Sequence, residues 1–482
     1  MTSERQDRLS DAAVFLTVLL GYLSARSHFF NFDGVACAIA VELSDFKHLV
    51  HGNHLLYGVL GWAFDSALRL AGFKGDALYS LQLLDCLLGA AGAAALAGLL
   101  RRLGAARTEA ALAAAALSAS YAWWMWSLEA QVYMLGAVPL ILAFSEAARE
   151  KPRPWAVGLW HALSMLGHAG HCVAAPALLW LLWAHSREKR DALAYFAWAA
   201  AAVVAAYVLA GLMAVKPASM NELRLWLLGS AAIGQSRSFH WHADLGVLDS
   251  LRAWSLTTLR VFCDFTRATG PARALGIVLA ALPLAAAASA FRRPAREAKA
   301  LGLWLLGHAA IYSTWEPTTI VYRVVDLPAL WALVWLGIDE LHVTAKARAI
   351  LLAGWGAAAG LYNWHAAVGP DTDPKRNVEY QESLEVGRRT PPEAWVAATA
   401  RNQVFYPYFG ARRPLNLRYY GTPAALAARV AELEARGESV FVTGRTLKEF
   451  PGLTGKVVVE KLEGDLLRLR ATASRRAGPG KG

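Results

Sequence analysis

The sequence has few cysteines, no phosphate-binding glycine loop and no repeat of fixed period. Its 482 residues include four cysteines, none in a CxxC pair: Cys37, Cys86, Cys172 and Cys263. This spacing indicates neither a disulfide framework nor a cysteine-based zinc site. No GxGxxG segment occurs, so a nucleotide fold of that type is not predicted. The terminal Gly478, Gly480 and Gly482 follow no predicted strand, and we expect a disordered end there.

Charged residues are also scarce. They make up 18% of the chain, whereas hydrophobic residues make up 56% and include 19 tryptophans. Runs of Ala, Leu and Trp recur from Ala12 to Ala366, each ended by a short polar or basic stretch, which is typical of many membrane-spanning helices. The net charge of +11 comes from basic residues between these runs. Membrane topology therefore explains the charge, and no nucleic-acid partner is predicted.

The apolar runs stop after Val368, which predicts two domains. Residues 1–368 are expected to form an all-α polytopic membrane domain, and residues 369–482 a small soluble α/β domain. Within the soluble domain the pattern predicts an extended segment over 402–408, a helix over 422–436 and strands over 439–443 and 456–461.

Basic clusters set the predicted orientation, because such clusters concentrate on the cytoplasmic side of a membrane. They lie at 101–107, 149–153, 187–190, 292–299 and 346–348. Placing all of them inside requires 11 or 13 crossings, a cytoplasmic N-terminus and an extracytoplasmic C-terminal domain. The first run, residues 12–25, is expected to be an uncleaved span. The run at 54–73 would add one crossing more than the basic clusters allow. Because it carries Asp65 and Arg69, we expect it to be an amphipathic helix lying in the interface. The bilayer in question is expected to be a bacterial inner membrane.

This topology brings polar residues of several loops to one membrane face. Two carboxylates are candidates: Asp33 follows the first span, and Glu129 lies at the outer tip of the next hairpin. A helix cap or turn would also explain Asp33, and an interfacial polar residue would also explain Glu129. Other candidates for substrate binding share the same face: His51, Asn53, His54, His168, His171, Glu316, Tyr322 and Arg323. A guanidinium at the lipid boundary suits a phosphate, although an arginine there can equally well be a snorkelling side chain.

Four segments carry a family resemblance. They are the acidic first loop 31–42, the run His51-Gly52-Asn53-His54-Leu55-Leu56-Tyr57, the stretch Trp126 to Tyr133, and Leu166-Gly167-His168 followed by His171 and 176–179. In order and spacing these segments resemble the GT-C superfamily of integral-membrane glycosyltransferases, particularly the branch of protein O-mannosyltransferase-like enzymes. The resemblance covers about residues 10 to 185.

The resemblance implies transfer of a sugar from a polyprenyl-phosphate donor to an acceptor hydroxyl on a protein, a lipid or an envelope glycan. It implies that Asp33 is the catalytic base or a metal ligand and that Glu129 assists. Tyr57 and Tyr133 belong to the resembling segments and are expected to contact substrate. Gln131 stands where relatives commonly have Glu.

Two further expectations concern the phosphate and a cofactor. Arg323 and His54 are predicted to neutralise charge on the departing phosphate. A divalent cation, Mg²⁺ or Mn²⁺, held by Asp33 and Glu129 is compatible with their oxygen ligands, but nothing in the sequence requires one.

Other functional classes also fit a polytopic membrane chain. In a transporter or lipid flippase, buried charges line a path through the bundle, and Asp85 is the clear acid within an apolar run. Neither inverted repeats nor broken helices support that class. A membrane assembly protein whose C-terminal domain recruits partners is the remaining alternative.

Overall fold

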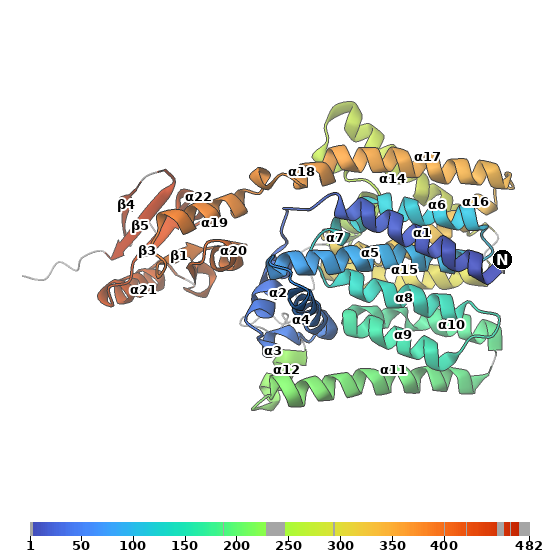
Figure 1. Ribbon diagram of the computed structural model, residues 1–482, viewed down its shortest axis with the longest axis horizontal. Helices are drawn as coiled ribbons and strands as arrows, with labels where there is room; N and C mark the ends of the chain where they lie inside the picture. Colours follow the sequence, from blue (N-terminus) through green and yellow to red (C-terminus); the bar gives the residue numbers. More distant parts are fainter. Residues whose placement is uncertain are drawn as a thin grey trace, which may run out of the picture. The chain divides into compact units, whose positions relative to one another are not determined.

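The computed structural model describes residues 3–186, 188–227, 246–292, 295–399, 401–420, 422–450, 457–462 and 464–471. The chain divides into two compact units, Met1–Thr372 and Asp373–Gly482. The first unit is a bundle of helices and the second is a small sheet with helices (Figure 1). The end at 478–482, for which disorder is predicted, lies outside the described residues.

Helices joined by short turns make up the first unit. Its N-terminal half contains α1 (Ser3–Leu23), α2 (Phe32–Glu42), α3 (Phe46–Leu49), α4 (Leu55–Leu70), α5 (Ala77–Arg102), α6 (Arg107–Ala119), α7 (Tyr121–Ser127), α8 (Tyr133–Ala147), α9 (Pro154–Gly167), α10 (Ala175–Ser186) and α11 (Lys189–Ala210). Its remainder contains α12 (Met220–Leu227), α13 (Val247–Arg260), α14 (Gly270–Ser289), α15 (Arg296–Trp315), α16 (Asp326–Asp339), α17 (Ala345–Asn363) and α18 (Gly369–Asp371).

Several of these helices begin at a polar side chain that caps a free backbone amide. The side chains of Asn31, Asp76 and Thr344 each accept a hydrogen bond from an amide two or three residues later, at the starts of α2, α5 and α17. Such caps satisfy amides that the first helical turn leaves without partners. They fix where the apolar helices start.

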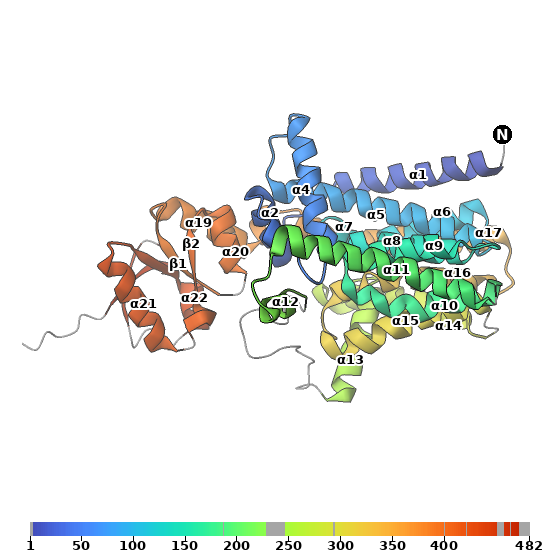
Figure 2. The same ribbon diagram turned by 90° about the horizontal axis from the view of Figure 1, so that it is seen from below.

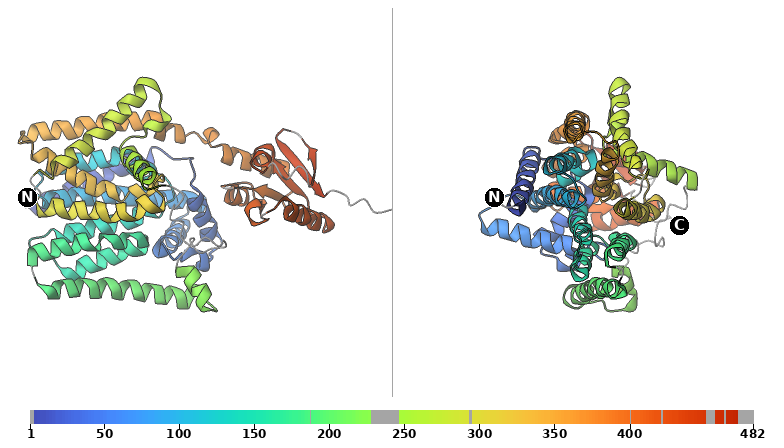
Figure 3. Two further views of the ribbon diagram at one scale, coloured as in Figure 1. Left: turned by 180° about the vertical axis from the view of Figure 1, so that it is seen from behind. Right: turned by 90° about the vertical axis from the view of Figure 1, so that its right-hand side faces the viewer.

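Helix α5 is the centre of the N-terminal half. It packs against α1, α4, α6 and α8, and most of its 26 residues have little exposure. The view along the helices places α1 at the edge of the bundle (Figure 3, right). Helices α2, α3 and α4 lie at the end of the bundle opposite the N-terminus (Figure 1).

The predicted apolar runs are confirmed as helices, including α4 over the run expected to lie in the interface. Among the described residues, three helical segments are long and apolar enough to cross a bilayer: Ala77–Arg102, Lys189–Val215 and Gly270–Ser289. Tyr133–Ala147 and Ala169–His185 are apolar but shorter. The number of crossings, 11 or 13, therefore stays a prediction. Residues 228–245, between α12 and α13, lie outside the described residues.

The second unit contains a five-stranded sheet in the order β2-β1-β3-β5-β4. Its strands are β1 (Trp395–Ala398), β2 (Arg413–Asn416), β3 (Val440–Thr443), β4 (Val457–Lys461) and β5 (Leu466–Ala471). Strands β2, β1 and β3 pair in parallel, with Trp395 opposite both Arg413 and Val440. Strand β5 pairs antiparallel with both of its neighbours, β3 and β4. The helices of this unit are α19 (Val378–Arg389), α20 (Asn402–Phe409), α21 (Pro423–Ala435) and α22 (Gly444–Glu449).

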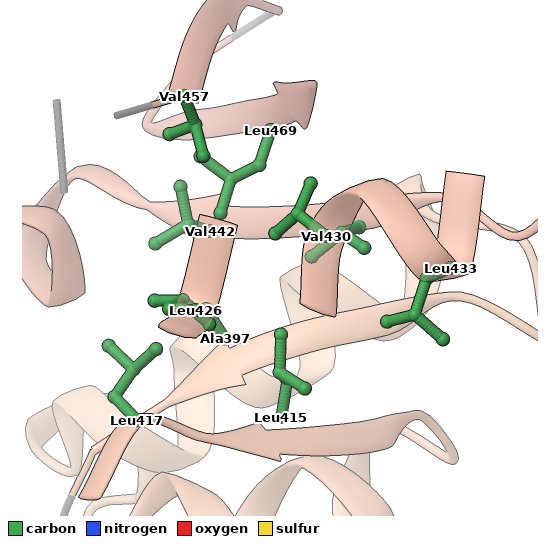
Figure 4. Packing of buried hydrophobic residues seen from close by; sticks show 10 residues of the cluster. Ala397, Leu415, Leu417, Leu426, Val430, Leu433, Val442, Val457 and Leu469 are labelled. Carbon is green, nitrogen blue, oxygen red and sulfur yellow. The ribbon is translucent and has the colours of Figure 1, made fainter. Parts of the chain in front are cut away.

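Apolar side chains of α21 form the core of the second unit with the sheet. Leu426, Val430 and Leu433 pack against Val442 and Leu469 of the strands (Figure 4). Burial of these side chains explains why a helix of ordinary propensity is stable there.

Most of the predicted soluble elements are confirmed, and one is wrong. The helix expected at 422–436 is α21, and the expected strands at 439–443 and 456–461 are β3 and β4. The segment 402–408 is not extended but forms α20. Its aromatic residues favour a strand locally, yet Phe405 and Tyr406 are fully buried and the Tyr406 hydroxyl donates to Glu382 of α19. Packing against α19 therefore overrides the local preference.

Candidate active site

Asp33 lies in the first turn of α2, at the end of the bundle that also holds α4. The Asn31 side chain accepts a hydrogen bond from the backbone amide of Asp33 at 2.9 Å and so fixes the start of the helix. The Asp33 side chain is exposed, and the side chain of Gln131 bonds to it. Surrounding protein atoms desolvate this carboxylate and raise its pKa, against the opposing effect of Gln131. An accessible carboxylate with a raised pKa is a stronger base than an ordinary aspartate.

The close approach of Asp33 to the segment 129–132 depends on Gly34. A Cβ at position 34 would lie 2.4 Å from the carbonyl oxygen of Ala130 and 2.8 Å from its Cβ. Both distances are too short for a real Cβ, and the carbonyl oxygen cannot move aside because it belongs to the backbone. The residue after the carboxylate is therefore glycine for a steric reason.

Glu129 holds the loop between α1 and α2 through hydrogen bonds. It is fully buried, and its carboxylate accepts hydrogen bonds from the Ser27 hydroxyl and, at 3.0 Å, from the backbone amide of Asn31. Burial raises the pKa of Glu129 to about 7, against the opposing effect of these bonds. Phe30, between the two donors, has φ 48°, a left-handed conformation that a bulky residue rarely adopts. Glu129 therefore holds a strained loop in place.

Asp85 supports the opposite side of the same site. It is fully buried on α5, and its Oδ2 accepts hydrogen bonds from the Tyr57 hydroxyl at 2.6 Å and the backbone amide of Gln131 at 2.8 Å. Its Oδ1 has no partner among the described residues. Tyr57 is also buried, so it acts here as a donor to Asp85 and lies in the core. Asp85 thus fixes the backbone of the residue whose side chain contacts Asp33.

Aromatic residues from distant segments gather beside Asp33. Tyr133 and Tyr322 both interact electrostatically with Asp33, and their rings meet edge to face at 5.5 Å. Tyr312 stacks on Tyr322 at 4.9 Å, and His168 lies 5.0 Å from the ring of Tyr133. Three of these residues, Tyr133, His168 and Tyr322, are among those predicted from the sequence to bind substrate. Glu316 is half-buried nearby, where it accepts a hydrogen bond from Thr319 and interacts with Tyr322.

The His51–His54 segment lies next to the loop of His168. The rings of His51 and His54 stack at 4.1 Å, and the backbone amide of Ala169 donates to the carbonyl oxygen of Asn53 at 2.7 Å. Burial lowers the pKa of His54 well below its ordinary value and that of His168 to about 4, and nearby histidines add to both effects. Both histidines are therefore neutral at pH 7 and act as hydrogen-bonding groups there, not as cations.

Arg323 is fully buried and forms an ion pair with Asp326 at 3.1 Å. Its guanidinium also lies over the rings of Trp254 and Tyr312, at 5.3 and 5.5 Å from their centroids. Among the described residues its Nε and Nη2 have no hydrogen-bond partner. Unpaired buried donors are costly, so these two nitrogens are suited to a ligand oxygen.

His171 lies next to His168, with 5.4 Å between their ring centroids. It is fully buried, its Nδ1 lies 3.3 Å from Nε2 of His308 on α15, and its backbone carbonyl is 2.9 Å from Nε2 of His161 on α9. His171 therefore lies between helices of the bundle, beside His168 and without exposure.

A cation shared by Asp33 and Glu129 does not fit the described residues. Both oxygens of Glu129 already accept hydrogen bonds from the first loop, and the side chain has no exposure. Within the described ranges, no group of three or more His, Cys, Asp or Glu residues is arranged to hold a metal ion.

Sequence reasoning did not select Gln131 or Tyr312 as site residues. Gln131 stood out only as a departure from the family pattern. Tyr312 lies four residues after His308 and four before Glu316, so these polar residues share one face of an otherwise apolar helix. That spacing is the signal that would have identified Tyr312.

No protein-family model matches the sequence, and no curated protein matches it significantly. Solved structures do resemble the fold. ArnT from Cupriavidus metallidurans bound to undecaprenyl phosphate has a TM-score of 0.64 at 13% identity, over 98% of this chain and 99% of that one. Its apo state gives 0.65 at 13% identity, over 97% of this chain and 98% of that one.

A second enzyme shares the fold. AglB, the oligosaccharyltransferase of Archaeoglobus fulgidus, in complex with an inhibitory peptide and a dolichol-phosphate, has a TM-score of 0.52 at 10% identity over 96% of this chain and 74% of that one. At these identities the likeness concerns the fold. It shows that the chain shares the fold of these two enzymes, while membership of the GT-C superfamily and of its O-mannosyltransferase-like branch stays a prediction.

Proposed function

We propose that this chain is a membrane glycosyltransferase that transfers a sugar from a polyprenyl-phosphate donor to an acceptor hydroxyl at the extracytoplasmic face. The observation that carries the proposal is the setting of Asp33, an accessible carboxylate with a raised pKa, beside Tyr133 and Tyr322 at one end of the bundle. Similarity of fold, over nearly the whole chain, to an enzyme solved with undecaprenyl phosphate supports a lipid phosphate as the carrier.

In the proposed reaction Asp33 is the general base. It accepts the proton of the acceptor hydroxyl while that oxygen bonds to the anomeric carbon of the sugar. The bond between this carbon and the phosphate oxygen breaks, and its electron pair stays on the phosphate. The products are a glycoside, polyprenyl phosphate and a protonated Asp33, which then loses its proton to water.

The departing phosphate needs hydrogen-bond donors and positive charge. Arg323 supplies a permanent charge and two donors that have no partner among the described residues. His54 and His168 supply neutral ring N–H groups. The tyrosines Tyr133, Tyr312 and Tyr322 offer aromatic faces and hydroxyl groups for the sugar. The acceptor is proposed at the level of a hydroxyl group on a protein, a lipid or an envelope glycan.

Asp33→Asn tests the base. The substitution preserves volume and the first turn of α2 but removes the proton acceptor, so turnover should fall by about 100-fold or more. Binding of undecaprenyl phosphate should change little. The measurement is transfer from a panel of polyprenyl-phosphate donors carrying different labelled sugars, using the purified full chain.

Asp76→Asn is the matched control. Asp76 is exposed and caps α5, and asparagine caps helices about equally well. Its transfer rate should equal that of the unmutated chain. Unchanged transfer by Asp33→Asn would refute the base assignment alone. If the unmutated chain transferred none of the sugars and did not bind undecaprenyl phosphate, the proposed function itself would be wrong.

A further inference from the structure

A groove of about 720 Å³ lies between α1, α5 and α8, and its charged residues come from the end of the bundle opposite Asp33. Along α5 its floor consists of the small residues Ala91, Ala94, Ala95 and Gly98, which recur every three or four positions on one helical face. Side chains of α1 and α8, such as Phe15 and Leu142, form the walls. Helix α1 runs along the edge of the bundle in two views (Figures 2 and 3).

One end of this groove is charged. Arg101 is bonded to Asp11 at 2.6 Å, and Asp7 to Arg107. On α8, Glu146 pairs with Arg149 at 2.9 Å and Arg153 at 2.8 Å. The acids at this end are thus matched by arginines.

Arg102 differs from these arginines. It is exposed, lines the groove, and among the described residues bonds only the carbonyl oxygen of Ser145, at 2.8 Å. Arg101, Arg149, Arg153 and the single acid Glu146 lie close enough to interact with it electrostatically. Arg101 also has an Nη1 atom with no partner among the described residues. The charged end of the groove is therefore in excess of positive charge.

We propose that this groove binds an anionic phospholipid of the leaflet opposite the candidate active site. The phosphate would lie against Arg102, and one acyl chain would lie along the small residues of α5. Basic pockets between membrane helices are suited to lipid head groups, and the small side chains leave the width that an acyl chain needs. The proposal is independent of the proposed function, because no residue of the groove belongs to the site of Asp33.

Two variants separate the two halves of the groove. Gly98→Leu fills the floor; a Cβ there would meet nothing closer than the Arg101 guanidinium at 3.8 Å, so the helix itself is not disturbed. Its control is Gly354→Leu on α17, where a Cβ would meet nothing within 4 Å. Arg102→Gln removes the charge, and its control is Arg8→Gln, an exposed arginine near the start of α1 whose partner is Glu4.

The purified full chain would be titrated with phosphatidylglycerol and with phosphatidylcholine of identical acyl chains, and binding followed by native mass spectrometry and by the shift in Tm. We expect phosphatidylglycerol to bind at least tenfold more tightly. Arg102→Gln should weaken that binding about fivefold, the effect of about one basic residue near a lipid surface. Gly98→Leu should abolish binding of both lipids, and both controls should bind normally.

Three results would overturn the proposal. They are equal affinity for the two lipids, equal lipid binding by Gly98→Leu and Gly354→Leu, or a rise in Tm with inorganic phosphate equal to the rise with phosphatidylglycerol. Loss of undecaprenyl phosphate binding in Gly98→Leu would also overturn it, because the groove would then belong to the donor.

Discussion

Asp85 offers a sharp test of how the candidate active site is supported. Both of its hydrogen bonds, from Tyr57 and from the amide of Gln131, go to the single oxygen Oδ2, and Oδ1 has no partner among the described residues. Asparagine can place its carbonyl oxygen at Oδ2 and its amide group at Oδ1. It therefore keeps both bonds while removing the carboxylate. Alanine removes both bonds and leaves a buried amide and a buried hydroxyl unpaired.

The expected magnitudes follow from these bonds. An unpaired buried polar group costs about 1–3 kcal/mol. If the free-energy cost of the unpaired Gln131 amide appears as poorer positioning of Asp33, Asp85→Ala should lower kcat/KM by about five- to 150-fold. Asp85→Asn should stay within about threefold of the unmutated rate. Cys86→Ala is the control, since Cys86 is the buried neighbour of Asp85 on the same helix and, within the described part of the chain, makes no hydrogen bond to Tyr57 or Gln131.

A pH profile separates positioning from general damage. The bond from Gln131 lowers the pKa of Asp33, so its loss in Asp85→Ala should raise that pKa further and move the acid limb of kcat/KM to higher pH. The limb of Asp85→Asn should not move. If Asp85→Asn were as inactive as Asp85→Ala, the carboxylate itself would be required. That result would refute the positioning argument.

Two further predictions concern Glu129 and topology. Because the folded-state pKa of Glu129 is raised to about 7 from 4.5, its contribution to stability is fully present below pH 4.5 and is lost as pH rises to about 7. The Tm of the unmutated chain minus that of Glu129→Gln should therefore fall across this range, by the equivalent of about 3 kcal/mol, and a pH-independent difference would contradict the assignment. For topology, Arg436→Cys, at a side chain with 58% exposure, should react with an impermeant thiol reagent in intact cells when Cys172 is replaced by serine; labelling only after permeabilisation would reverse the predicted orientation.

The fold was predictable in the segments whose surroundings are the bilayer. Long apolar runs such as those of α5 and α14 have no alternative to helix in a bilayer, because every backbone polar group must be paired within the segment. In the soluble unit, α20 was wrong because its aromatic residues prefer strands locally, and only burial of Phe405 and Tyr406 decides otherwise. Strands β1, β2 and β5 were missed. β1 is buried along most of its length and β2 contains a proline, so neither shows the alternation of a half-buried strand.

The candidate site was predictable in its membership and much less so in its roles. Charge topology placed Asp33, His168 and Tyr322 on one face without information about contacts. It could not tell an acid that faces solvent from one that is bonded inside, since Asp33 and Glu129 both follow apolar runs. Nor could it assign Tyr57 to the core, because its partner Asp85 lies 28 positions away.

The hydrogen bonds of the three carboxylates distinguish their roles even without a ligand. A general base must accept a proton from a substrate and release it, so it needs an oxygen that a substrate can reach. Glu129 and Asp85 have no exposure, and each already accepts two hydrogen bonds, at least one from a backbone amide. Moving either side chain would break the loop or the turn that it holds. Asp33 is exposed and rests on a helix whose start is fixed by Asn31 and whose approach is permitted by Gly34. Among these three acids, Asp33 alone has an oxygen that a substrate can reach, and the hydrogen bonds of the buried pair hold the segments around it.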